Sequence, residues 1–122
     1  MKTNKSNNFR ITVIDYLEVA EFRLIVDNEN RVLYEFAKRL EVTPTQILEP
    51  NKTRYISEIR HLYCKLRNEM HGISYSETAR EIGRTHTAVI KGLKRINKKL
   101  FWEERNIVMM WNRVKDIPGL FQ

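Results

Sequence analysis

The sequence predicts an all-α, multi-helix domain, and three observations support this fold class. Apolar residues recur at helical spacing through three segments, at about residues 32–40, 55–70 and 89–100. Residues that begin or end helices stand between these segments, with Ser74 before one apolar run and Gly83 after it. A strand-like alternation is noted only near the N-terminus, where a helix competes with it. The pattern therefore indicates helices packed on one another.

The composition is that of one folded domain with extensions. The chain has 122 residues, of which 42% are hydrophobic and 30% are charged, which argues against a disordered or membrane-embedded protein. No apolar run approaches the ~18 residues of a spanning helix, and the polar N-terminus does not resemble a signal peptide. Cys64 is the only cysteine, so no internal disulfide is expected and a reducing cytoplasm fits best.

The positive charge is concentrated in one part of the chain. Of the 22 Lys and Arg residues, twelve lie between Lys52 and Lys99, together with four of the 15 acidic residues. This segment carries a charge of +8 within a net charge of +7, and the flanks together carry −1. Such concentration favours a polyanion-binding surface. A solvated charged face is the alternative.

The first predicted helices precede this basic segment. A helix from about Thr12 to Val26 is favoured over a strand that begins at Phe9. After a break at residues 27–30, five apolar residues repeat at helical spacing: Val32, Leu33, Phe36, Ala37 and Leu40. Thr43-Pro44 begins a short helical turn with Pro in its first position. A loop follows over residues 49–54.

A longer helix is predicted from Tyr55, and His71-Gly72 ends it as a glycine cap does. One face of this helix holds its apolar residues, namely Ile56, Ile59, Leu62, Tyr63, Leu66 and Met70. Ser74 then begins the next helix, with Glu77 reaching back to it in a capping box. Gly83 closes that helix, because glycine adopts the positive φ of a tight turn.

Thr85 is expected to cap a further helix that has a buried stripe and a polar outer face. The stripe consists of Val89, Leu93, Ile96 and Leu100, and the outer face of His86, Thr87, Lys91, Lys94, Arg95 and Lys98. Two short helices around a glycine turn form the layout of a helix-turn-helix, whose second helix enters the DNA major groove. The sequence therefore predicts a DNA-binding protein rather than an enzyme.

Residues 101–122 are predicted to form one more amphipathic helix, which ends near Ile117-Pro118-Gly119. Its apolar residues are Trp102, Ile107, Met110, Trp111 and Val114. Packing on the chain's own core is favoured over self-association or a protein partner through residues 101–122. The predicted organisation is an N-terminal extension over residues 1–30, a DNA-binding domain over 31–100, and this C-terminal helix and tail.

The segment Gly83-Arg84-Thr85-His86-Thr87-Ala88-Val89 resembles a G-R-D-H-T-T-V signature. That signature belongs to the C-terminal DNA-binding domain of the bacterial chromosomal replication initiator DnaA. The similarity extends from about Val32 to Lys99, through segments that resemble the opening helix, the basic loop and long helix, and the first helix-turn-helix element. The resemblance implies a helix-turn-helix of the DnaA C-terminal, Trp-repressor-like type, in a bacterial, cytoplasmic and nucleoid-associated protein.

The resemblance also implies which residues contact double-stranded DNA. Arg54 matches the basic-loop arginine that enters the minor groove. The major-groove base contacts fall on Thr85, His86, Thr87 and Ala88. By resemblance, phosphate contacts are expected of Arg60, His61 and Arg84. Phosphate contacts are also expected of four further basic residues that lie near these positions: Lys52, Lys91, Lys94 and Arg95.

The sequence departs from the family in four respects, one of which is that the loop before Arg54 is less basic than usual. Thr85 replaces the family's Asp and removes an acceptor for a base amino group, and Ala88 replaces its second Thr and loses a hydroxyl. The resemblance therefore predicts DNA binding without predicting recognition of the family's usual nine-base box. The chain also contains no G-x-x-x-x-G-K-[ST] sequence, so no nucleotide is expected to bind.

No cofactor and no metal site are expected. His61 and Cys64 lie three residues apart on one predicted helix, with His71 near its end, but a second cysteine is lacking. The favoured function is a sequence-specific double-stranded DNA-binding protein in replication control or transcription. The alternative is a protein-interaction adaptor that has lost specific DNA binding and uses its Trp- and Met-rich C-terminal helix. The departures at Thr85 and Ala88 motivate this alternative.

Overall fold

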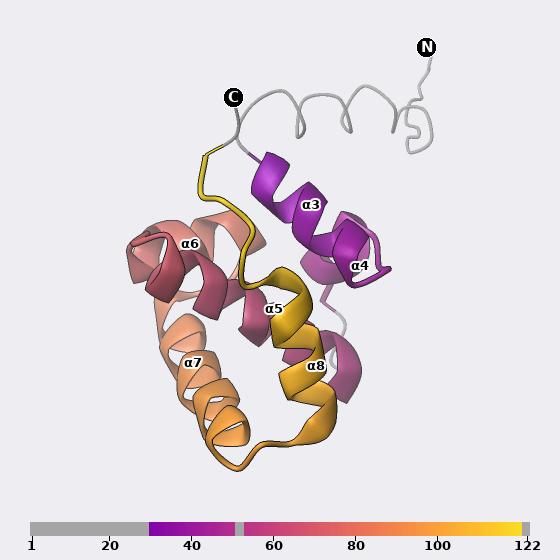
Figure 1. The fold of residues 1–122 in the computed structure, drawn as a ribbon. Helices are drawn as coiled ribbons and strands as arrows, with labels where there is room; N and C mark the ends of the chain where they lie inside the picture. The colour runs from indigo at the N-terminus through magenta and orange to yellow at the C-terminus, as the bar shows by residue number, and fades with distance from the viewer. Residues whose placement is uncertain (1–29, 51–52, 121–122) are drawn as a thin grey trace. The chain divides into compact units, whose positions relative to one another are not determined.

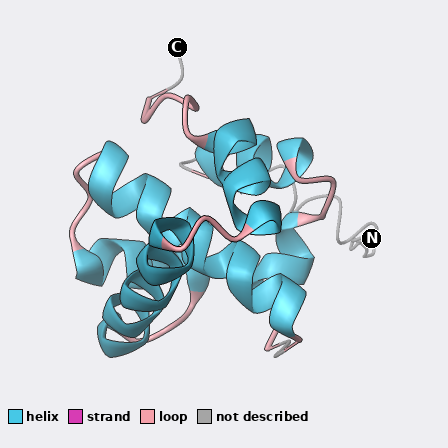
Figure 2. Ribbon diagram, turned by 60° about the horizontal axis from the view of Figure 1, so that its bottom comes forward, coloured by secondary structure: helices cyan, strands magenta, loops and turns pink. Residues whose placement is uncertain are grey.

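Every regular element in the described part of the chain is a helix, which confirms the all-α fold class (Figure 2). The computed structural model describes residues 30–50 and 53–120, so the helix expected from Thr12 to Val26 and the side chain of Lys52 lie outside the described residues. The chain divides into two units, Met1–Arg31 and Val32–Gln122, and the described residues belong almost entirely to the second. No helix in the described ranges is long and apolar enough to cross a membrane.

Short connections join successive helices of the second unit (Figure 1). The elements are α3 (Arg31–Arg39), α4 (Pro44–Leu48), α5 (Arg54–Lys65), the π-helical turn η1 (Leu66–Met70), α6 (Tyr75–Ile82), α7 (His86–Phe101) and α8 (Arg105–Val114). Helix α5 is central, because it packs against α4, α6, α7 and α8, and most extensively against α7. Its position fixes the placement of α7 relative to the other helices.

Hydroxyl side chains cap four of these helices, as the sequence indicates for α6 and α7. Ser74 Oγ accepts a hydrogen bond from Glu77 N–H at 3.1 Å, and Thr85 Oγ1 accepts one from Ala88 N–H at 3.1 Å. Within the described residues, Glu77 makes no return bond, so α6 has a serine cap without the full box. A complete capping box instead joins Thr43 and Gln46 at the start of α4.

The apolar residues expected on α3, α5 and α7 form a single buried core. Phe36 of α3 and Tyr63 of α5 meet edge to face in this core, with ring centroids 5.2 Å apart. Ile107 and Val114 of α8 are buried in the same core, and so is Ile117. The C-terminal helix therefore packs on its own domain, as the sequence favoured.

Two predicted core residues are instead exposed, Met70 and Trp102. The chain changes from α-helix to π-helix at Leu66, and the wider turn rotates Met70 away from the core. This change is marked by the bond from His71 N–H to the Leu66 carbonyl, five residues back, at 3.1 Å. Helix α7 ends at Phe101, so Trp102 lies in the turn to α8 rather than on either buried face.

Candidate nucleic-acid interface

Helices α6 and α7 form the predicted helix-turn-helix. Gly83 ends α6 in the left-handed conformation, with a φ of +67°, which a residue with a side chain adopts only at a cost. The chain then turns within two residues, and Thr85 caps the 16-residue helix α7. Val89, Leu93 and Ile96 are buried on the inner face of α7, so the opposite face of this helix points to solvent.

The first turn of α7 and its cap form an exposed tip. The tip consists of the four residues expected to contact bases: Thr85, His86, Thr87 and Ala88, all of which are exposed. The Thr85 oxygen is committed to the cap, while its hydroxyl hydrogen and methyl group remain available. The tip therefore presents a hydroxyl, an imidazole and methyl groups, which are the chemical groups that read base edges in a major groove.

Unpaired cations continue along α7 beyond the tip. Lys91, Lys94, Arg95 and Lys98 are all exposed. None of the four forms an ion pair with a carboxylate among residues 30–50 and 53–120. Their charge is therefore not neutralised within the described structure, and it is available to a polyanion.

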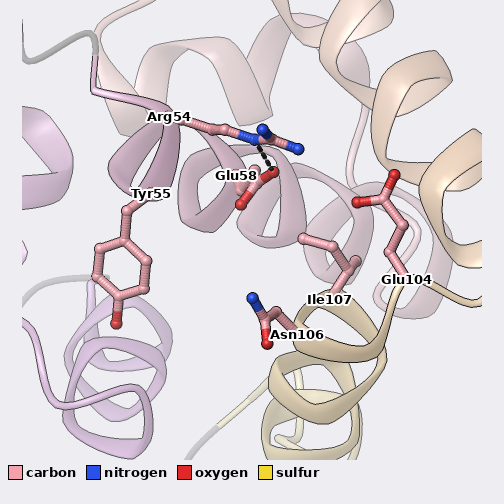
Figure 3. Close-up of a pocket in the computed structure, with 6 residues that line it drawn as sticks. All are labelled: Arg54, Tyr55, Glu58, Glu104, Asn106 and Ile107. Carbon is pink, nitrogen blue, oxygen red and sulfur yellow. Dashed lines mark hydrogen bonds and ion pairs between the residues drawn. The ribbon is translucent and has the colours of Figure 1, made fainter.

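Arg54 begins α5 and borders an open hollow of about 410 Å³ between the N-terminal ends of α5 and α8 (Figure 3). Its side chain is exposed, and its Nε donates to Glu58 Oε2 at 3.1 Å. The same carboxylate oxygen accepts a bond from Lys99 Nζ at 2.6 Å. Burial alone would raise the pKa of Glu58, but Lys99 and Arg54 lower it below its ordinary value. Glu58 thus links Arg54 to α7.

Arg60, an expected phosphate contact, bonds to main-chain carbonyls of the domain. The residue is only 7% exposed. Its Nε donates to the Ile47 carbonyl at 2.8 Å, and its Nη2 donates to the Glu49 carbonyl at 3.0 Å. Because these bonds satisfy carbonyls at the C-terminal end of α4, Arg60 braces α4 against α5. The phosphate contact expected of Arg60 stays a prediction, and the guanidinium concerned is held by main-chain carbonyls.

Arg84 also bonds to carbonyls at the C-terminal end of α4, and it shares the Glu49 carbonyl with Arg60. Its Nη2 donates to Glu49 O at 2.9 Å, and its Nη1 donates to Ile82 O at 2.9 Å and to Leu48 O at 3.4 Å. The side chain is half-buried. The phosphate contact expected of Arg84 stays a prediction, and the guanidinium concerned is held in place by main-chain acceptors.

His61 packs between α5 and α7 and is only half exposed. A Cβ atom at Gly92 would lie 2.5 Å from His61 Cδ2, so only glycine lets α7 approach the ring this closely. Burial, and then the nearby cations Arg95 and Lys99, lower the pKa of His61 to about 4. The ring is therefore neutral at pH 7 and brings no charge to a phosphate, although it keeps one N–H donor.

Acidification from pH 7 to pH 4 is expected to lower the free energy of unfolding, by about 2 kcal/mol from His61 alone. The pKa of His61 is about 4 in the fold and 6.5 as the ordinary value. The unfolded chain therefore binds the proton more readily, and this stability is complete above pH 6.5 and lost by about pH 4. Urea denaturation at a series of pH values measures the decline. An equally steep decline in His61→Gln would contradict this origin.

The other two candidate metal ligands are Cys64 and His71. The Cys64 thiol is buried, and burial raises its pKa to about 12. His71 Nδ1 accepts from Arg67 at 2.9 Å, and its Nε2 donates to the Ile117 carbonyl at 2.7 Å. Among the described residues, no three His, Cys, Asp or Glu side chains are arranged to hold a metal ion.

The sequence analysis did not identify the ion pairs and hydrogen bonds that connect the helices of the interface. Glu58 lies four residues after Arg54, a spacing at which helical ion pairs form. That spacing was a usable signal for the first pair. The pair of Glu58 with Lys99 joins residues 41 positions apart, and the bonds of Arg60 go to main-chain carbonyls. Neither of these leaves a pattern in the sequence.

Comparison with known proteins assigns the family. The model of the bacterial dnaA protein helix-turn-helix matches residues 30–96, which is more than half of the chain. No curated protein and no solved structure matches the chain. The matched family is a DNA-binding helix-turn-helix rather than a catalytic domain. The chain therefore belongs to the bacterial DnaA helix-turn-helix family, and its function is to bind DNA.

Proposed function

We propose that this protein binds double-stranded DNA with sequence specificity and acts in replication control or transcription. The observation that carries the proposal is the exposed tip at the start of α7, followed on the same helix by cations that lack carboxylate partners. A helix that presents polar groups at its N-terminal end and positive charge along its length suits a major groove bordered by phosphates.

In this proposal the contacts divide into three kinds. Bases in the major groove are contacted by Thr85, His86, Thr87 and Ala88. Arg54 enters the adjacent minor groove, where a narrow A·T-rich stretch favours arginine. Phosphates are contacted by Lys52, Arg60, Arg84, Lys91, Lys94 and Arg95, with His61 as an uncharged donor. The adaptor alternative receives less support, because the apolar face of α8 is used in the core.

Selection from a randomised duplex pool tests this proposal directly. The retained oligonucleotides should share one site, and a labelled copy of that site should bind more tightly than a scrambled duplex. If about six phosphates are neutralised, the logarithm of the affinity should fall against the logarithm of the salt concentration with a slope of about −5. Absence of binding to any duplex at micromolar protein and low salt would favour the adaptor.

His86→Ala and Lys94→Ala are expected to weaken binding in different ways. His86→Ala should cost about 1–3 kcal/mol on the selected site and leave the affinity for scrambled duplex unchanged, because it removes a base contact. Lys94→Ala should weaken both duplexes alike, because it removes a phosphate contact. Fluorescence anisotropy titrations measure both, with the exposed Lys115→Ala as control. An equal loss on both duplexes for His86→Ala would remove His86 from the base contacts.

A further inference from the structure

An exposed aromatic pair lies at the C-terminal end of α7. Phe101 is 76% exposed and Trp102 is 68% exposed. The two rings meet edge to face, with centroids 5.4 Å apart. They therefore contact each other while the larger part of each ring faces solvent. Large apolar side chains exposed to this degree, and next to each other, indicate a binding surface rather than a structural one.

The aromatic pair continues the line of unpaired cations on α7. Residues spaced by about three, four, seven or eleven positions share one face of a helix. Counting from Thr87, this spacing includes Lys91, Lys94 and Lys98. Phe101 and Trp102 lie three and four positions after Lys98. One face of α7 therefore begins with the tip and continues through cations to Phe101, and Trp102 follows in the turn to α8.

The aromatic pair lies too far from the tip to enter the same major groove. A rise of ~1.5 Å per residue places Phe101 about 21 Å along the helix axis from Thr87. The major groove is only ~12 Å wide, so the rings lie beyond it. At that point a duplex offers phosphates, because its bases are stacked inside. An unpaired strand offers both phosphates for the cations and base faces for the rings.

We propose that the C-terminal part of the outer face of α7, from Lys98 onward, binds an unpaired DNA strand next to the duplex, with Phe101 and Trp102 stacking on its bases. This inference rests on the proposed DNA-binding function. Charge complementarity favours this occupant over an apolar protein surface, because Lys98 is exposed and forms no ion pair with a carboxylate among the described residues. Two acids follow the pair in sequence. Glu104 lines the hollow beside Arg54 and Glu58 (Figure 3), and Glu103 directly follows Trp102 in sequence.

Binding to tailed and blunt duplexes tests the proposal. The probes are a labelled blunt duplex and the same duplex with a single-stranded thymidine tail. The unaltered protein should bind the tailed probe about tenfold more tightly, as expected for stacking on one base. The double variant Phe101→Ala, Trp102→Ala should lose this preference and keep its affinity for the blunt duplex. The control is Met109→Ala, because Met109 is exposed on α8 and lies outside this face.

Tryptophan fluorescence gives a second, independent readout. The chain has two tryptophans, so Trp111→Phe leaves Trp102 as the sole reporter. Oligothymidine should quench this emission, and the quenching should weaken with rising salt. Equal binding of tailed and blunt probes, or unquenched emission at saturation, overturns the proposal and leaves duplex binding intact. Failure to bind blunt duplex, with the tailed probe still bound, overturns the double-strand proposal instead.

A second copy of the chain is the competing occupant of this surface. Sedimentation without DNA distinguishes the two, because a protein interface at Phe101 and Trp102 would make the unaltered chain associate and the double variant monomeric. That result would overturn the strand-binding proposal. A monomer in both cases, together with a tail preference that depends on the rings, would support it.

Discussion

Replacing Lys91, Lys94 and Arg95 together by Ala is expected to reduce the affinity for any duplex about 100-fold or more at about 0.1 M salt. All three are exposed on α7 without carboxylate partners among the described residues, so each can release a counterion when it meets a phosphate. The slope of log affinity against log salt should become less negative by about 2.7, because each phosphate contact contributes about 0.9. Anisotropy titrations over a series of salt concentrations measure both quantities.

The matched control for this variant removes the same charge elsewhere. Lys38, Arg105 and Lys115 are exposed cations outside α7, and replacing them by Ala gives the same net charge. If the location of the charge on α7 decides binding, the control retains most of the affinity and most of the salt slope. Equal losses in both variants would mean that net charge alone attracts DNA, and the interface on α7 would then be wrong.

Arg67→Ala is expected to lower the free energy of unfolding by about 3–5 kcal/mol. The Arg67 guanidinium forms two bonds to Glu81, from Nε to Oε1 at 2.9 Å and from Nη2 to Oε2 at 2.8 Å. The side chains are only 8% and 19% exposed. The Tyr63 hydroxyl donates to the same carboxylate at 2.6 Å. Removing the arginine leaves a poorly solvated carboxylate in the link that holds α6 to α5 and η1.

Urea denaturation followed by circular dichroism measures this loss, and Arg39→Ala is its matched control. Arg39 is likewise ion-paired, in its case with Glu35 and Asp116, but these side chains are considerably more exposed. Its removal should cost about 1 kcal/mol or less. Changing both partners to apolar residues, as in Arg67→Met with Glu81→Leu, should restore much of the stability. A loss below about 1 kcal/mol for Arg67→Ala would contradict the assigned role.

Local signals in the sequence were sufficient to predict the helix-turn-helix. Ser74 and Thr85 are caps whose hydroxyl groups act on residues three positions later, and Gly83 is needed for a positive φ. Each of these effects depends on neighbours within four residues, so sequence order alone expresses it. The buried stripe at Val89, Leu93 and Ile96 follows from helical periodicity in the same way.

Features set by distant residues could not be predicted. The π-helical turn at Leu66–Met70 changes which side chain faces the core, and no residue type in the segment requires that turn. Arg60 carries the charge of a phosphate contact, and only the position of the Ile47 and Glu49 carbonyls shows that its guanidinium is occupied. The family resemblance assigned this residue by position, and position does not reveal burial.

The carbonyls at the end of α4 accept hydrogen bonds from two arginines that belong to different parts of the interface. Arg60 lies on the helix that Arg54 begins, and Arg84 directly precedes the tip. The end of α4 therefore holds both the helix that carries Arg54 and the residue before the tip. The minor-groove and major-groove contacts should therefore lie at a fixed distance from each other, and the protein should require a fixed spacing between the two halves of its DNA site. Inserting one base pair between the minor-groove and major-groove halves moves them apart by ~3.4 Å and rotates them by about 35°. We expect such a site to engage only one half at a time.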